Sequence, residues 1–131
     1  MGEFKVVSRR IQITAGNVSM EAELTESETA NALWEALPIT GAANVWGEEI
    51  YFSIPLEAPQ EASAREEMEV GEIAYWPPGK AFCIFFGRTP ASVDDAPRAA
   101  SAVNPLGRVT GDPKDFLKVR SGEEVLLERA P

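Results

Sequence analysis

Two pairs of adjacent aromatic residues flank a Pro-Pro-Gly turn in the segment EIAYWPPGKAFCIFFG, residues 72–87. Tyr75 and Trp76 precede the turn, and Phe85 and Phe86 follow it. Aromatic side chains that remain on a surface line apolar pockets for ligands. Neighbouring residues of a strand point to opposite faces, so one of the two phenylalanines faces the core, and Trp76 beside the turn fits either position. The segment is therefore either a folding hairpin or the wall of a site.

Polar candidates for such a site lie on the predicted strand of residues 48–54, where Glu48 or Glu49 and Tyr51 would supply the polar contacts. The chain has no histidine, which excludes a Ser-His-Asp or Cys-His nucleophile and removes the commonest ligand of zinc, copper and iron. Cys83 is the only cysteine, and its apolar neighbours predict a buried thiol. We predict no metal site and no cofactor. An enzyme that uses Glu and Tyr as acid and base has no support beyond the presence of those residues.

The composition is that of one soluble globular domain spanning residues 1–131, with 44% hydrophobic and 25% charged residues. No apolar run approaches the roughly 20 residues needed to span a bilayer, and the N-terminal segment has no signal-peptide pattern, so we expect a cytoplasmic protein. The net charge is -9, and no cluster of Lys and Arg interleaved with aromatics is present. We therefore expect neither a membrane nor a nucleic-acid partner.

The elements that must position these residues are mostly strands. Alternation in residues 5–13 and 18–24 around Gly16-Asn17 predicts a hairpin. A Ser/Thr-x-x-Glu start, Thr25 to Glu28, and apolar spacing up to Pro38 predict a helix near residues 28–37. The acidic segment 57–69 is interpreted as a solvated loop, because a hard-cation loop needs Asp, Asn and Gly, which it lacks.

The second half of the chain continues this pattern of strands. Pro78-Gly79 suits a type II turn, and Asp112-Pro113 starts a second short helix near residues 113–119. The remaining expected elements are strands 72–76, 81–86, 106–110 and 123–128 and a long loop over residues 88–103. Seven or eight antiparallel strands with two short helices favour a closed barrel, because closure removes exposed edges.

Three stretches in this order, "EIYFSIPLE", "GEIAYWPPGKAFCIFFGRTP" and "NPLGRVTGD", resemble the small prokaryotic cyclophilin-like family of uncharacterised single-domain proteins. The resemblance covers almost the whole chain. It implies a mainly β fold, a closed eight-stranded cyclophilin-like β-barrel with two short capping helices. In true cyclophilins an outer face of the barrel isomerises the bond before proline, where an arginine lowers the double-bond character of the amide and an apolar pocket grips the proline ring.

The residues of that isomerase site are only partly matched. Cyclophilins carry the arginine in a Phe-His-Arg-Ile-Ile-Pro stretch, which places Phe52 at the arginine when it is laid on residues 50–55. Phe85 and Phe86 match the aromatic pair of the cyclophilin Gln-Phe-Phe, whereas Ile84 stands in place of the glutamine. The pocket tryptophan and histidine have no counterpart. Arg108 is the best candidate for a relocated arginine.

Two hypotheses follow. We favour a non-catalytic domain that binds a peptide or small ligand on an aromatic face, and the alternative is a weak peptidyl-prolyl isomerase that uses a relocated arginine. We expect a concave apolar patch around Trp76, Tyr75 and the loop of residues 88–103. The predicted ligand-binding residues are Tyr75, Trp76, Phe86, Phe52, Tyr51, Glu49 and Arg108.

Overall fold

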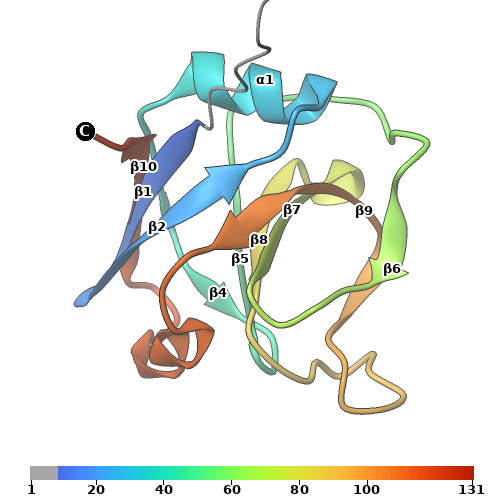
Figure 1. Ribbon diagram of the computed structural model, residues 1–131. Coiled ribbons are helices and arrows are strands. Elements are labelled where there is room, and N and C mark those ends of the chain that lie inside the picture. Colours follow the sequence, from blue (N-terminus) through green and yellow to red (C-terminus); the bar gives the residue numbers. More distant parts are fainter. Residues whose placement is uncertain (1–8) are drawn as a thin grey trace, which may run out of the picture.

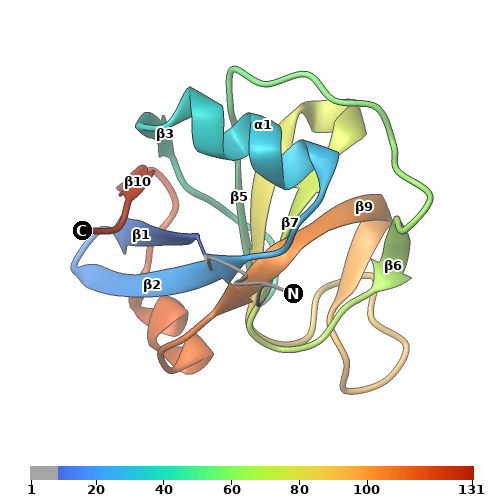
Figure 2. The same cartoon turned by 45° about the horizontal axis from the view of Figure 1, so that its top comes forward.

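The computed structural model describes residues 9–131, which form a mainly β structure with a helix at either end (Figures 1 and 2). The expected strand that begins at residue 5 lies partly outside the described residues. The strands are β1 (Arg10–Ala15), β2 (Val18–Leu24), β3 (Ile39–Ala42), β4 (Asn44–Val45), β5 (Glu49–Ser53), β6 (Arg65–Glu67), β7 (Glu72–Trp76), β8 (Ala81–Phe85), β9 (Arg98–Val109) and β10 (Glu124–Arg129). The helices are α1 (Glu28–Ala36) and the 3-10 helices η1 (Pro77–Gly79) and η2 (Pro113–Lys118).

All ten strands belong to one antiparallel system. Its hydrogen-bonded order is β3-β10-β1-β2-β9-β7-β8-β5-β4, with β6 paired to β9 beside this path. The two ends, β3 and β4, follow each other in the chain with only Ala43 between them, but no ladder joins them within the described residues. The predicted closed eight-stranded barrel is therefore not confirmed. The sequence missed β3, β4 and β6 because strands of two to four residues are too short to display alternation.

The strands β5, β7 and β8 are covered on both faces, and this decides where their side chains lie. On β8 and just beyond it, Phe82, Ile84 and Phe86 point into the main core. The alternate residues Cys83 and Phe85 belong to a second, smaller core. Sheets covered on both sides carry nearly continuous apolar runs. Both phenylalanines of the FF pair are consequently buried, each in a different core.

The second core exists because two segments that the sequence presented as loops form strands. The segment 57–69 contains β6, and residues 98–103 of the expected long loop are the first half of β9. β6 pairs with this part of β9, with Arg65 opposite Val103 and Glu67 opposite Arg98. In Figure 1 the two strands lie side by side on the right of the molecule. Long-range pairing here overrides the weak strand propensity of an acidic segment.

The turn between β7 and β8 differs from the expected type II turn. Residues 77–79 form the 3-10 helix η1, and Lys80 takes the left-handed conformation with φ 48°. Gly79 is required by a close approach, because a Cβ there would lie 2.7 Å from the indole ring of Trp76. The Pro-Pro-Gly sequence therefore both reverses the chain and makes room for Trp76.

Helix α1 was predicted correctly in extent, but it begins at a different cap. Ser27, not Thr25, is the N-cap, and its Oγ accepts a hydrogen bond from the backbone N–H of Ala30 at 3.1 Å. We expect Ser27→Ala to lower the free energy of unfolding by about 1 kcal/mol, the usual contribution of such a cap. Thermal or urea unfolding measures this change. The exposed Ser63→Ala serves as control, and equal effects of the two substitutions would contradict the capping role.

Candidate functional site

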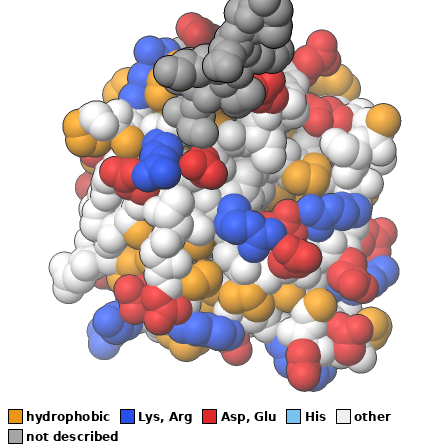
Figure 3. Space-filling model, viewed as in Figure 1, with side chains coloured by type: hydrophobic (Ala, Val, Ile, Leu, Met, Phe, Trp, Pro, Cys, Tyr) orange, Lys and Arg blue, Asp and Glu red, His pale blue; other side chains and the backbone are white. Residues whose placement is uncertain are grey.

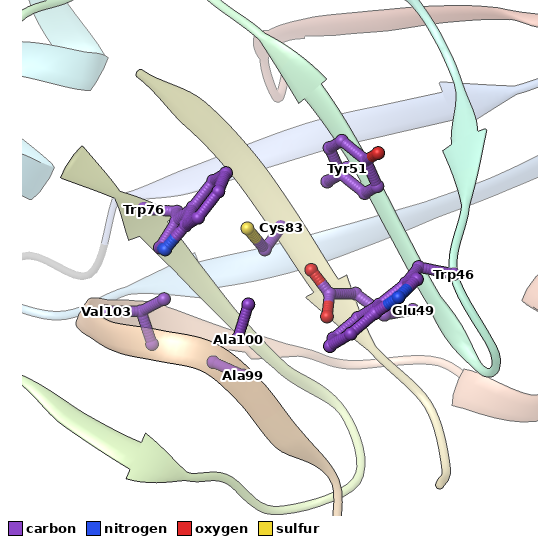
Figure 4. A pocket seen from close by; sticks show the side chains of 8 residues that line it. All are labelled: Trp46, Glu49, Tyr51, Trp76, Cys83, Ala99, Ala100 and Val103. Atoms are coloured by element: carbon purple, nitrogen blue, oxygen red, sulfur yellow. The ribbon is translucent and has the colours of Figure 1, made fainter. Parts of the chain in front are cut away.

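A cavity of about 220 Å³ opens on the outer face of the sheet, between β5, β8, the end of β7 and the first half of β9 (Figure 4). We call it the outer pocket. Small side chains form its floor and the wall on β9, namely a cysteine, two alanines and a valine. Aromatic side chains form its other walls. It is lined by Trp46, Glu49, Tyr51, Trp76, Cys83, Ala99, Ala100 and Val103.

Three half-buried aromatic side chains from different parts of the fold surround the cavity. Trp76 ends β7, and its indole N–H donates to Ser101 Oγ at 2.7 Å, which fixes the ring against β9. Tyr51 reaches the pocket from the middle of β5, because strand alternation sends Phe52 into the main core. Figure 4 shows Trp46 and Trp76 on opposite sides of the opening, with Cys83 and Glu49 between them.

Trp46 and Glu49 are brought together by the tight turn between β4 and β5. The backbone N–H of Trp46 donates to the carbonyl of Glu49 at 2.9 Å, which closes the turn. Gly47 within the turn has φ 61°, and a Cβ there would lie 2.9 Å from the carbonyl oxygen of Arg88. Only glycine satisfies both conditions without strain. The local sequence Trp-Gly-Glu-Glu thus places an indole beside a carboxyl group.

Glu49 is the polar centre of the outer pocket. Its residue is 5% exposed, and its Oε1 is buried with no hydrogen-bond partner among the described residues. Burial raises the pKa of this carboxyl to about 7, although the neighbouring thiol of Cys83 opposes part of the shift. The group is therefore protonated more readily at neutral pH than an ordinary glutamate. Figure 4 shows the carboxyl group directed into the cavity.

Cys83 forms the floor beside this carboxyl group. Burial raises the pKa of its thiol well above the usual value, and the negative charge of Glu49 raises it further. A thiol must ionise to become a nucleophile, so this one is unreactive at neutral pH. The structure confirms the buried thiol that the sequence predicted.

The structure brings together three of the predicted site residues, Glu49, Tyr51 and Trp76. Three others lie in the main core: Tyr75 is 0% exposed, Phe52 1% and Phe86 2%. The hydroxyl of Tyr75 donates to the backbone carbonyl of Leu56 at 2.7 Å, which satisfies its polar atom inside the protein. These three residues shape the fold beneath the pocket and do not line it.

Arg108 lies on a different surface. Its guanidinium pairs with Glu69 at 2.5 Å, in a polar groove that also contains Arg65 and Glu72. Arg65 and Glu72 pair at 2.5 Å in turn. On the face of the molecule in Figure 3, Lys and Arg side chains lie beside Asp and Glu and form no basic stripe. The lack of a nucleic-acid partner stays a prediction.

Sequence reasoning missed Trp46 as a pocket residue. The two-residue strand β4 before it carries no periodic pattern, and the turn that directs its ring toward β8 was not predicted. The available signal was the pair Trp46-Gly47 directly before the alternating strand, since Gly after a bulky residue often marks a tight turn. Ala99, Ala100 and Val103 do belong to the segment 88–103 that was expected beside Trp76.

A sequence model described as cyclophilin-like matches residues 9–128. The chain belongs to the cyclophilin-like family. A solved relative of this cyclophilin-like protein is the hypothetical protein AF2241 from Archaeoglobus fulgidus, known from a solution structure. It is 43% identical, with a TM-score of 0.82, over 99% of this chain and 100% of that chain. A search of curated proteins finds no match.

The outer pocket of this cyclophilin-like domain contains no arginine among its lining residues. The position that the resemblance assigned to the cyclophilin arginine, Phe52, points into the main core. Within residues 9–131, no group of three or more His, Cys, Asp or Glu side chains is placed to hold a metal ion. In the same residues, none of the helices is long and apolar enough to cross a membrane. The outer pocket therefore offers a ligand one carboxyl group surrounded by aromatic side chains.

Proposed function

We propose that this cyclophilin-like domain binds a small ligand, or one side chain of a peptide, in the outer pocket, and that it does so without efficient catalysis. One observation carries the proposal: the carboxyl group of Glu49 points into the cavity, and its buried Oε1 has no hydrogen-bond partner within the described residues. A buried polar atom without a hydrogen bond costs about 1–3 kcal/mol. A ligand that donates to this oxygen recovers that free energy on binding.

The size of the cavity limits the ligand. Its volume of about 220 Å³ is below the roughly 300–1,000 Å³ of pockets that hold drug-sized molecules. It is several times the ~30 Å³ that one water molecule occupies in the liquid. The outer pocket therefore suits a compact group, either a small free molecule or a single side chain.

The lining residues supply binding groups but few catalytic ones. The thiol of Cys83 is protonated because burial raises its pKa, and none of the lining residues in the described part of the chain carries a positive charge to polarise a carbonyl group. The half-buried rings of Trp46, Tyr51 and Trp76 offer apolar area and flat faces. This balance favours recognition over reaction.

Binding is tested with a library of small fragments and short X-Pro peptides, followed by two-dimensional NMR of the amide groups. We expect ligands to shift signals from β5, β8 and the first half of β9. Removing an aromatic wall by Trp46→Ala is expected to weaken binding about fivefold, which corresponds to about 1 kcal/mol of lost aromatic contact.

Val45→Ala is the matched control for this experiment. Val45 precedes Trp46 in the chain, is 40% exposed, and is not part of the outer pocket. Its replacement leaves binding unchanged if the outer pocket is the site. Ligands that shift signals elsewhere, or that bind the Trp46→Ala protein as tightly as the original, would refute the proposal.

A further inference from the structure

We infer that the outer pocket recognises an alkylammonium cation, carried by a small amine or by a lysine side chain. The inference rests on the proposed function and names the class of ligand. Its basis is a juxtaposition: the rings of Trp46, Tyr51 and Trp76 stand around a cavity whose one charged lining group is the carboxyl group of Glu49 (Figure 4).

The aromatic walls favour a positive charge. The face of an aromatic ring carries partial negative charge, and a cation within about 6 Å of the ring centre gains roughly 0.5–2 kcal/mol, with Trp the most favourable ring. Two of the three rings here are tryptophans, held on opposite sides of the opening. The hydrogen bond from Trp76 to Ser101 at 2.7 Å keeps one indole in place before any ligand arrives. A preformed wall reduces the entropy lost on binding.

The carboxyl group of Glu49 selects the same sign of charge. Its residue is 5% exposed and its Oε1 has no partner in the part of the chain that the structure describes. An isolated carboxylate in a buried site is costly unless an opposite charge is supplied. Within residues 9–131, neither Lys nor Arg lines the outer pocket, which favours a ligand as the source of the compensating charge. An anionic ligand would be repelled by both the carboxylate and the ring faces.

The remaining lining residues leave space for the substituents of the cation. Cys83, Ala99 and Ala100 are small, and they line the cavity with little polar surface. Methyl groups on nitrogen, or the methylenes of an aminoalkyl chain, pack on such a surface. A neutral molecule of the same shape makes these apolar contacts but gains no charge–charge attraction from the carboxylate.

Ionisation of Glu49 makes recognition of a permanent cation depend on pH. The pKa of about 7 means that the carboxylate fraction rises from about one tenth at pH 6 to about nine tenths at pH 8. The other titratable lining groups are Tyr51 and Cys83, and the thiol of Cys83 stays protonated because burial raises its pKa. Arg98, which precedes the lining residue Ala99 on β9, pairs with Glu66 at 2.8 Å and does not line the cavity. Affinity for the cation should therefore rise about tenfold from pH 6 to pH 8.

The test compares choline with 3,3-dimethyl-1-butanol, a neutral molecule of the same shape, by calorimetric or NMR titration of the full chain. At pH 8 we expect choline to bind at least tenfold more tightly than the alcohol, and its affinity to fall about tenfold at pH 6. Choline carries a permanent charge, so this dependence belongs to the protein. A short peptide containing trimethyllysine forms the second arm. Tighter binding of the peptide than of choline identifies a protein side chain as the source, and the reverse identifies a free amine.

Glu49→Gln keeps the shape of the side chain and removes its charge. We expect this variant to lose the pH dependence and to keep only the part of the preference for choline that the aromatic rings supply. Glu48→Gln is the matched control, because Glu48 is adjacent in sequence but pairs with Lys114 at 2.8 Å outside the pocket. It should retain the preference for choline.

The two proposals fail in different ways. Equal affinity of the original protein for choline and for the alcohol overturns the inference, and leaves the proposed function standing if other ligands bind in a manner sensitive to Trp46→Ala. An unchanged preference in Glu49→Gln also overturns it. If no fragment, peptide or cation binds in the outer pocket, both the inference and the proposed function are refuted.

Discussion

Replacing Glu49 with glutamine is expected to raise the free energy of unfolding by about 3 kcal/mol at pH 8 and by only about 1 kcal/mol at pH 5. The carboxyl has a pKa of about 7 in the folded protein, against 4.5 for an ordinary glutamate. Between these two values the unfolded chain releases its proton while the folded protein keeps it. Stability therefore falls as pH rises through this window, and above pH 7 the full penalty remains, at about 1.4 kcal/mol for each pKa unit.

Urea unfolding of the original protein, Glu49→Gln and Glu48→Gln at both pH values measures this effect. Glu48 forms a partly exposed salt bridge with Lys114, so its replacement should change stability by less than about 1 kcal/mol at either pH. A stability difference for Glu49→Gln that is the same at pH 5 and pH 8 would show that the carboxyl titrates normally. The penalty at Glu49 is the free energy that a bound cation would recover.

Prolyl isomerase activity is expected to be at least about 100-fold below that of a true cyclophilin. The position laid on the cyclophilin arginine is Phe52, which is buried in the main core, and no arginine lines the outer pocket. Loss of one preorganised donor costs about 2.7–4 kcal/mol, or roughly 100- to 1,000-fold in rate. A protease-coupled assay or NMR exchange on a short X-Pro peptide measures the turnover.

The alternative of a relocated arginine makes the opposite prediction. In our proposal Arg108, which pairs with Glu69 in a groove separate from the outer pocket, takes no part in isomerisation. The original protein and Arg108→Ala should then show the same low turnover. Turnover at the cyclophilin level that is lost in Arg108→Ala, and kept in Arg98→Ala, would establish isomerase activity through Arg108. Arg98 is a suitable control because it lies on the same strand and is also paired with a glutamate.

Local patterns in the sequence determined several elements directly. The hairpin of β1 and β2 follows from alternation around Gly16-Asn17, and α1 follows from apolar spacing that ends before Pro38. The period of two along β5 also accounts for the placement of Ile50 and Phe52 on the face opposite Tyr51. The resemblance to the cyclophilin-like family was correct because three quoted stretches occur in the right order along one chain.

Only the tertiary structure decided which aromatic side chains reach the site. The run EIAYW is apolar at every position but the first, and AFCIF is apolar at every position, so period-two alternation could not distinguish their two faces. Whether a side chain of this face lies in a core or in the pocket depends on β6 (residues 65–67) and the first half of β9 (residues 98–103). These two strands cover part of the outer face. Tyr75 is consequently buried while Trp76, the next residue, borders the cavity.

The properties of Glu49 also depend on contacts remote in sequence. In the sequence, Glu49 is one of two adjacent glutamates in an acidic protein, and either Glu48 or Glu49 was a candidate for the polar contact of the site. Strand alternation separates them, but burial of Glu49 requires Cys83 on β8, the turn that places Trp46, and the approach of β9. Desolvation by these neighbours raises its pKa. A strand pattern specifies the face to which a side chain points, whereas the elements packed against that face determine whether it meets water, a core or a cavity.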